Sequence, residues 1–305
     1  MATQLTHMEV YNIKTIQYAN GEVEIRKYSR PIGDDGGESL GLTSEELGAR
    51  SLRGKKRIQD ILDPEKEINP FTGQEEDMYC FGYYDILAER ERRCLKNSYK
   101  RTVNELYNIS RQCEWKYFIT LTFDIKKVDR YDYSLCMGKA NKWFMNQKNR
   151  YAKDLQYVFV PEQHKDGAWH IHGLIAQCDG MKFVDSGKKN KGKTVYNLDG
   201  WRNGFSTAVP IGETRKDILK VSTYITKYIT KDLCQITKGK KRYYRSQNIP
   251  KPIITVDAIE GGTDIDYVDM VADSLGMEVS YTKEVKGYVD VNYIYQFHPQ
   301  SHPLL

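Results

Sequence analysis

The stretch LQYVFVPEQHKDGAWHIHGLIA, residues 155–176, decides the fold. It contains two short runs rich in β-branched and other apolar residues, Leu155–Val160 and His170–Ala176. Between them lies His164-Lys-Asp-Gly167, a polar segment that ends in glycine and has the composition of a turn. Two such runs joined by a turn predict neighbouring strands of one sheet.

Two histidines, His170 and His172, flank Ile171 in the second run. Side chains at positions i and i+2 of a strand project from the same face, so we expect both imidazoles on one side and Ile171 on the other. Glu162 precedes His170 by eight residues and lies on the neighbouring predicted strand. Two imidazoles and a carboxylate from adjacent strands can hold a divalent metal ion with open coordination positions.

Other interpretations of this motif stay open. Gln163 and His164 are rival third ligands, and His164 shares the face of Glu162 if the strand is regular. The histidines can also fill one face of a sheet without binding a metal.

The flanking sequence predicts more of the same sheet. Tyr117–Phe123 alternates as a strand, with Ile119 and Leu121 on one face and Thr120 and Thr122 on the other. Helices are predicted over 85–110, 134–151 and 215–236, and a lysine-rich loop over 182–194. Strands separated by helices in this way indicate an α+β fold, a sheet with helices on one side.

The segment YITKYITK, residues 224–231, carries a second pattern. On a continuous helix, at 100° per residue, Tyr224, Tyr228, Lys227 and Lys231 fall within one arc of about 100°. The lysines can offset phosphate charge and favour the phenolate form of the tyrosines. The alternative is an amphipathic helix whose tyrosines cover the sheet.

Taken together, these motifs resemble the HUH endonucleases, and more narrowly the rolling-circle replication initiators of small single-stranded DNA phages and related plasmids. The resemblance covers residues 115–250, about 45% of the chain. It implies a five-stranded antiparallel sheet of the ferredoxin-like nuclease type, with the tyrosine helix beside it. It also implies that Glu162, His170 and His172 are ligands of Mg²⁺ or Mn²⁺.

The same resemblance assigns the catalytic residues and the reaction. Tyr224 and Tyr228 match the paired nucleophiles of the phage-type initiators, and Lys227 and Lys231 match the lysine three residues after each. The implied activity is metal-dependent nicking and joining of single-stranded origin DNA through a 5′-phosphotyrosine intermediate. A helicase and a polymerase of the host are the further partners it implies.

Three other functions compete with this one. A plasmid mobilisation relaxase and a single-strand transposase use the same chemistry, although relaxases usually place the tyrosine before the histidine motif. A non-catalytic module for single-stranded DNA would use the tyrosines to stack bases. The segment 187–194 also matches the P-loop pattern GxxxxGK[ST], but no helical pattern follows it, so we expect no nucleotide cofactor.

The charge of the chain is distributed unevenly over its 305 residues. Residues 1–75 contain 10 Lys and Arg against 13 Asp and Glu, residues 76–250 contain 33 against 19, and residues 251–305 contain 3 against 9. A basic middle between acidic ends indicates a polyanionic partner for the middle. We therefore predict an N-terminal hairpin and linker region at 1–75, an endonuclease domain at 76–250 and an acidic C-terminal extension at 251–305.

Several classes of protein are not expected. No apolar run approaches the ~20 residues of a membrane span, so we expect no membrane partner. The N-terminus shows no secretory signal, and the six cysteines are scattered without a CxxC pair. We expect free thiols and a location in the cytoplasm of a bacterial host. In the terminal regions the sequence predicts a hairpin over 8–30 around Asn20-Gly21, a helix over 44–62, and two strands after residue 277.

Overall fold

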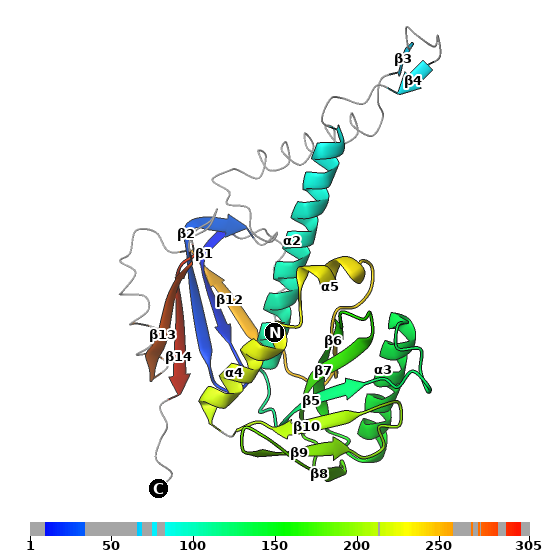
Figure 1. Cartoon of the computed structure of the whole chain (residues 1–305). Coiled ribbons are helices and arrows are strands. Elements are labelled where there is room, and N and C mark those ends of the chain that lie inside the picture. Colours follow the sequence, from blue (N-terminus) through cyan, green and yellow to red (C-terminus); the bar gives the residue numbers. More distant parts are fainter. Residues whose placement is uncertain are drawn as a thin grey trace. The chain divides into compact units, whose positions relative to one another are not determined.

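The computed structural model describes residues 10–33, 66–68, 75–77, 83–212, 214–258, 270, 274, 276–285 and 291–299 (Figure 1). The chain divides into two units. The first comprises residues 1–16, 22–94 and 254–305, and the second comprises residues 17–21 and 95–253. The helix expected over 44–62 lies outside the described residues.

The first unit contains a five-stranded sheet in the order β12-β1-β2-β14-β13. Its strands are β1 (Val10–Gln17), β2 (Val23–Gly33), β12 (Ile253–Asp257), β13 (Met277–Val285) and β14 (Val291–Pro299). A separate pair joins β3 (Lys66–Ile68) and β4 (Glu75–Asp77). Sequence analysis treated the N-terminal region and the acidic extension as separate, whereas here strands from both ends share one sheet.

The hairpin predicted at the N-terminus is confirmed. β1 and β2 are neighbours in the sheet and turn at Asn20-Gly21. Gly21 has φ of 82°, a left-handed conformation that glycine adopts without steric cost. The two C-terminal strands are also confirmed, as β13 and β14.

The second unit is built on a seven-stranded sheet in the order β11-β6-β7-β5-β10-β9-β8. Every pairing in it is antiparallel. Its strands are β5 (Tyr117–Thr122), β6 (Gln156–Gln163), β7 (Trp169–Ala176), β8 (Phe183–Asn190), β9 (Lys193–Leu198), β10 (Ser206–Pro210) and β11 (Tyr244–Arg245). The α+β class is therefore confirmed, while the sheet is wider than the five strands expected.

The extra width comes largely from the lysine-rich segment, which was wrongly predicted as a loop. Residues 183–198 form the β8–β9 hairpin, whose turn carries Lys191 and Gly192 at positive φ. The Phe183 ring stacks on Tyr117 with centroids 4.4 Å apart, which fixes the hairpin to the sheet. Because the GxxxxGK[ST] match lies across this hairpin, no helix N-terminus follows it.

Helix α3 (Tyr133–Arg150) covers one face of this sheet. Asp132 caps its N-terminus, accepting a hydrogen bond from the Leu135 amide at 3.0 Å. Its buried side chains recur every three or four residues, the spacing of one helix face: Tyr133, Cys136, Met137, Ala140, Trp143, Phe144 and Gln147. Phe144 stacks on Tyr157 and Phe159 of β6, with centroids 4.3 and 5.0 Å apart.

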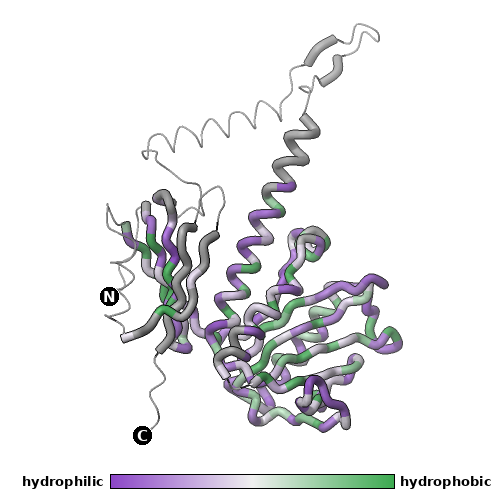
Figure 2. Tube along the Cα trace, turned by 60° about the vertical axis from the view of Figure 1, so that its left-hand side comes forward, coloured by the Kyte–Doolittle hydropathy of each residue, from purple (hydrophilic) through white to green (hydrophobic). Residues whose placement is uncertain are grey.

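The other helices of the described chain are α2 (Tyr83–Ser110), α4 (Arg215–Thr226) and α5 (Lys231–Ile236). Hydrophilic residues alternate with hydrophobic ones along α2 in Figure 2, and Leu106 and Ile109 enter the core. The Ser222 hydroxyl of α4 donates to the Ser110 carbonyl oxygen at 2.8 Å, which ties α4 to the end of α2.

The helix predicted over 215–236 is interrupted, so the prediction was wrong at residues 227–230. Thr223, Ile225, Thr226, Ile229 and Thr230 are β-branched and have low helix propensity. The Thr230 hydroxyl accepts a hydrogen bond from the Leu233 amide at 3.0 Å and so caps a new helix, α5. Tyr224 therefore lies on α4, whereas Tyr228 lies in the turn that follows it.

Two exclusions from the sequence can be compared with the structure. Within the described ranges, no helix is both long and apolar enough to cross a membrane. The five cysteines in the described part of the chain, Cys94, Cys113, Cys136, Cys178 and Cys234, are free thiols as expected.

Gly173 follows the second histidine on β7 and has no room for a side chain. A Cβ atom there would lie 2.9 Å from the Val158 carbonyl oxygen and 3.0 Å from the Phe159 Cβ. We predict that Gly173→Ala lowers the free energy of unfolding by about 1–3 kcal/mol, as overpacking does. Chemical denaturation of the purified protein measures this.

Gly138 provides the matched control, because it lies on α3 with open space at its Cβ position. Gly138→Ala should stabilise the protein by about 0.5–1 kcal/mol, since alanine is the better helix former. Equal effects of the two substitutions would contradict the tight packing at Gly173.

Candidate active site

The register of β6, β7 and β5 brings three polar side chains together. Val160 and Thr120 lie opposite His172, while Glu162 lies opposite His170. The Glu162 Oε2 atom is 2.7 Å from Nε2 of His172, and the Thr120 hydroxyl is 3.2 Å from Nδ1 of the same ring. Both nitrogens of His172 therefore have a partner, and its orientation is fixed.

His164 also joins this group. Its ring stacks on His170, with centroids 3.5 Å apart and planes within 10°. Its Nε2 atom lies 3.7 Å from the Glu162 Oε2 atom. The structure thus brings the rival ligands Glu162 and His164 to the same place. Gln163, the other rival, donates instead to the Gly167 carbonyl oxygen in the turn, at 3.0 Å.

Burial keeps the two histidines of β7 uncharged at neutral pH. It lowers the pKa of His170 to about 4, with a smaller contribution from the charges of His164 and His172. Burial also lowers the pKa of His172, against the opposing effect of the Glu162 carboxylate. A neutral imidazole is the form that binds a metal ion.

The two tyrosines of the YITKYITK segment meet at this cluster. The Tyr228 ring stacks on His172, with centroids 3.9 Å apart and planes within 11°. Its hydroxyl donates to the Tyr224 hydroxyl, with the two oxygens 3.1 Å apart. Although the helix is interrupted between them, the turn keeps both phenols together. Ile225 and Ile229 are buried, which directs the tyrosines to the sheet face.

The two phenols differ in their surroundings. The Tyr224 side chain is exposed, and the Lys227 Nζ atom lies 5.2 Å from its ring centroid. Tyr228 is half-buried, and its pKa is raised by burial and then by its hydrogen bond to Tyr224. For Tyr228, the expected shift towards phenolate is therefore wrong in this structure. The side chain of Lys231 lies outside the described residues.

Sequence analysis did not identify two residues that shape this cluster, Phe118 and Thr120. The Phe118 ring contacts Tyr224 and Tyr228, with centroids 5.3 and 6.2 Å apart. Both residues lie on the face of β5 opposite Ile119 and Leu121, as the strand alternation indicates. The alternation could have placed them on the site face, but only the pairing of β5 with β7 shows what they touch.

The donor set fits a divalent metal ion. It offers one carboxylate and neutral imidazole nitrogens, the ligands that Mn²⁺ and similar ions accept in proteins. The side chains are not arranged as a finished site, because Glu162 is bonded to His172 and His164 is stacked on His170. Within the described part of the chain, no three His, Cys, Asp or Glu side chains form a group that could hold a metal ion as they stand.

The fold and the site define an α+β protein whose sheet face gathers imidazoles, a carboxylate and two phenols. Residues 116–233 match the family model of the replication-associated protein ORF2, a family of rolling-circle replication proteins of small phages, and this segment belongs to that family. The segment includes Glu162, His170, His172, Tyr224 and Tyr228. The family implies an interaction with DNA. No curated protein and no solved structure matches the chain.

Glu162 has a defined electrostatic effect on His172. Its carboxylate raises the pKa of His172 against the effect of burial. We therefore predict that Glu162→Gln lowers the pKa of His172 further. An NMR titration of the imidazole signals in the presence of EDTA measures this.

Asp166→Asn is the control for that titration. The Asp166 carboxylate acts on His170 but is not among the groups that shift the pKa of His172. The pKa of His172 should stay unchanged in this variant. A rise of that pKa in Glu162→Gln would refute the assigned contact.

Proposed function

We propose that this protein initiates rolling-circle DNA replication by nicking and rejoining single-stranded origin DNA through a tyrosine–phosphate linkage. The observation that carries the proposal is the stacking of Tyr228 on His172, with the Tyr224 hydroxyl 3.1 Å from that of Tyr228. Two nucleophile candidates thus lie beside the histidine–carboxylate cluster. The family match over residues 116–233 supports the same function.

Within this proposal the sheet has the role of an HUH nuclease core. Glu162, His170 and His172 would hold Mg²⁺ or Mn²⁺, with His164 as the alternative third ligand. When bound, the ion would act as a Lewis acid that stabilises charge on a non-bridging oxygen of the scissile phosphate. Thr120 positions His172 through its Nδ1 atom, as an outer partner of a metal ligand does.

The covalent step is a transesterification. The phenolic oxygen of one tyrosine forms a bond to the scissile phosphorus, and the bond from phosphorus to the 3′ oxygen breaks. The phenol loses a proton, the leaving 3′ oxygen gains one, and the protein remains joined to the 5′ phosphate. Because one phosphodiester replaces another, joining needs no ATP, and the free 3′ hydroxyl primes synthesis.

Two tyrosines suit a reaction that must occur twice. After one round of synthesis, the second phenol attacks the regenerated origin, and the first strand's 3′ hydroxyl releases a closed circle. The short distance between the Tyr224 and Tyr228 oxygens lets each approach nearly the same phosphate position. Lys227, beside the Tyr224 ring, offsets the charge of that phosphate, and we assign Lys231 the same role for the second tyrosine.

The first prediction of this proposal concerns the nucleophiles. With Mn²⁺ and single-stranded DNA from its own replicon, the protein should form a covalent adduct visible on a denaturing gel. Tyr224→Phe or Tyr228→Phe alone should leave one cleavage step possible, whereas the double variant should form no adduct. Each substitution removes only the attacking oxygen.

Tyr131 and Tyr151 are matched controls, because both are exposed tyrosines of the same unit outside the cluster. The double variant Tyr131→Phe/Tyr151→Phe should form the adduct at the normal level. If the Tyr224→Phe/Tyr228→Phe variant still formed it, the nucleophile assignment would be wrong. If the unchanged protein formed no adduct on several origin strands, a DNA-binding module without catalysis would replace the proposal.

The second prediction concerns the metal ligands. His170→Ala with His172→Ala should abolish metal-dependent cleavage, because the imidazole donors are lost. Single variants at Glu162 and His164 separate the rival third ligands: the true ligand should cost far more cleavage than its rival. A gel assay over a range of Mn²⁺ concentrations measures this, and circular dichroism checks that each variant is folded. Nicking retained by the double histidine variant would overturn the metal assignment.

A further inference from the structure

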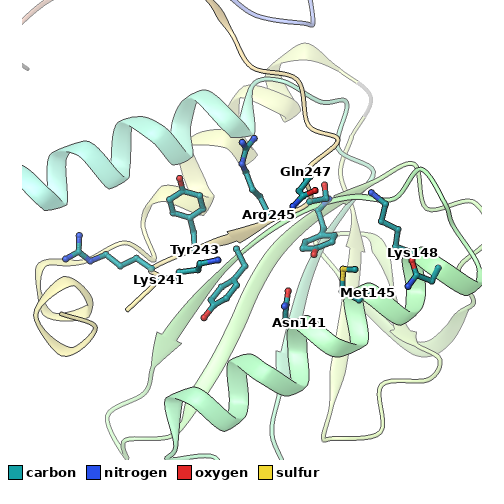
Figure 3. A pocket seen from close by; sticks show the side chains of 12 residues that line it. Asn141, Met145, Lys148, Lys241, Tyr243, Arg245 and Gln247 are labelled. Carbon is teal, nitrogen blue, oxygen red and sulfur yellow. The ribbon is translucent and has the colours of Figure 1, made fainter. Parts of the chain in front are cut away.

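A groove away from the catalytic cluster has the chemistry of a nucleic-acid site. It lies between α3 and the segment 241–247 and has a volume of about 700 Å³. Figure 3 shows Asn141, Met145 and Lys148 on α3 and Lys241 and Tyr243 on the facing segment. Pockets of roughly 300–1,000 Å³ hold small organic ligands, so a base and its phosphate have room here.

The groove is strongly basic. Four of its lining residues are cationic: Lys148, Lys241, Arg242 and Arg245. None of the described residues that line it is acidic. Cations that converge from two elements without a carboxylate among them form an electrostatic site for a polyanion.

Its other side chains are suited to nucleobases. Amides line it at Asn141, Asn149 and Gln247, and they can bond to base edges. The Tyr244 ring stacks on Phe159 with centroids 4.8 Å apart, and the Lys241 Nζ atom lies 5.7 Å from the Tyr244 centroid. Tyrosines next to lysines and arginines are typical of surfaces that bind single strands, whose bases are unpaired.

The segment that forms this wall is held in place. The Arg242 guanidinium donates to the hydroxyls of Ser98 and Thr102 of α2, at 2.5 and 3.2 Å. The Tyr243 hydroxyl donates to Glu105 of the same helix at 3.0 Å. The groove wall is thus preorganised by α2, which lowers the entropy cost of binding a ligand.

The position of the groove relates it to the catalytic cluster. β11 is the edge strand of the seven-stranded sheet and pairs with β6, where Tyr244 lies opposite Phe159. Three residues further along β6 is Glu162, whose side chain belongs to the cluster. Phe159 packs towards α3, on the other face from Glu162. A DNA strand that leaves the cluster over β6 would pass this edge.

We propose that this groove binds a second stretch of single-stranded DNA, adjacent to the stretch held at the tyrosines. The inference rests on the proposed function in taking single-stranded DNA as the ligand, but it requires no cleavage. Phosphates lie against Lys148 and Lys241, and a base lies beside Tyr244 and the amides. The groove thus extends the DNA contact from the catalytic face to the edge of the sheet.

The test measures DNA affinity in a form of the protein that cannot react. In a Tyr224→Phe/Tyr228→Phe background, Lys148→Glu/Lys241→Glu should weaken binding of a fluorescent single-stranded oligonucleotide at least tenfold. Losing two phosphate contacts should also reduce the slope of log affinity against log salt by about 1.4, at roughly 0.7 per contact. Fluorescence anisotropy over a series of salt concentrations measures both quantities.

The control variant carries the same change in net charge. Lys139 lies on the other side of α3, and Lys191 lies in the β8–β9 turn; both are exposed and neither lines the groove. Lys139→Glu/Lys191→Glu should change the affinity less than threefold. An equal loss in both double variants would show a general charge effect and overturn the proposal, as would no loss in either.

The affinity measurement also separates this inference from the proposed function. Absence of a covalent adduct with the unchanged protein would refute the nicking function and leave the groove assignment standing on its binding data. Unchanged affinity in Lys148→Glu/Lys241→Glu would refute the groove while leaving the tyrosine chemistry intact. Circular dichroism of each variant excludes unfolding as the cause of a loss.

Discussion

The register of β7 between β5 and β6 is the constraint on which the candidate site depends. A strand alternates its side chains with a period of two, so a slip of one residue would move both imidazoles to the face covered by α3. Ile171 and Gly173 prevent that slip: Ile171 is fully buried, and the absence of a side chain at Gly173 allows close packing. The core on one face therefore determines which residues meet on the other.

Much of this architecture could be predicted from local patterns. The strands of residues 155–176, helix α3 and the Asn20-Gly21 hairpin follow from alternation, helical spacing and turn chemistry. The β8–β9 hairpin could not, because its lysines hide the few apolar positions that fix it, such as Phe183. The interruption after Thr226 was missed because a helical pattern of tyrosines and lysines continues through it. The sharing of one sheet by the two ends of the chain depends on contacts between residues more than 200 positions apart.

The candidate site divides in the same way. Glu162, His170 and His172 could be predicted together, because their spacing on two neighbouring strands is a local property. Tyr224 and Tyr228 were predicted from a helix that ends between them, and they meet because the turn keeps their hydroxyls close. Phe118 and Thr120 required the pairing of β5 with β7. The raised pKa of Tyr228 required its burial against His172, which no sequence pattern contains.

The break between α4 and α5 has a mechanical meaning. On a continuous helix the two phenols would move as parts of one rigid rod, and bringing one forward would carry the other along. Here Tyr224 is held by the last turn of α4, while Tyr228 follows it on a turn with single i→i−3 hydrogen bonds at Lys227 and Ile229. A few backbone torsions in that turn separate the two side chains. The chain thus carries two phenols on supports of unequal stiffness, which lets one exchange places with the other while α4 stays packed on α2.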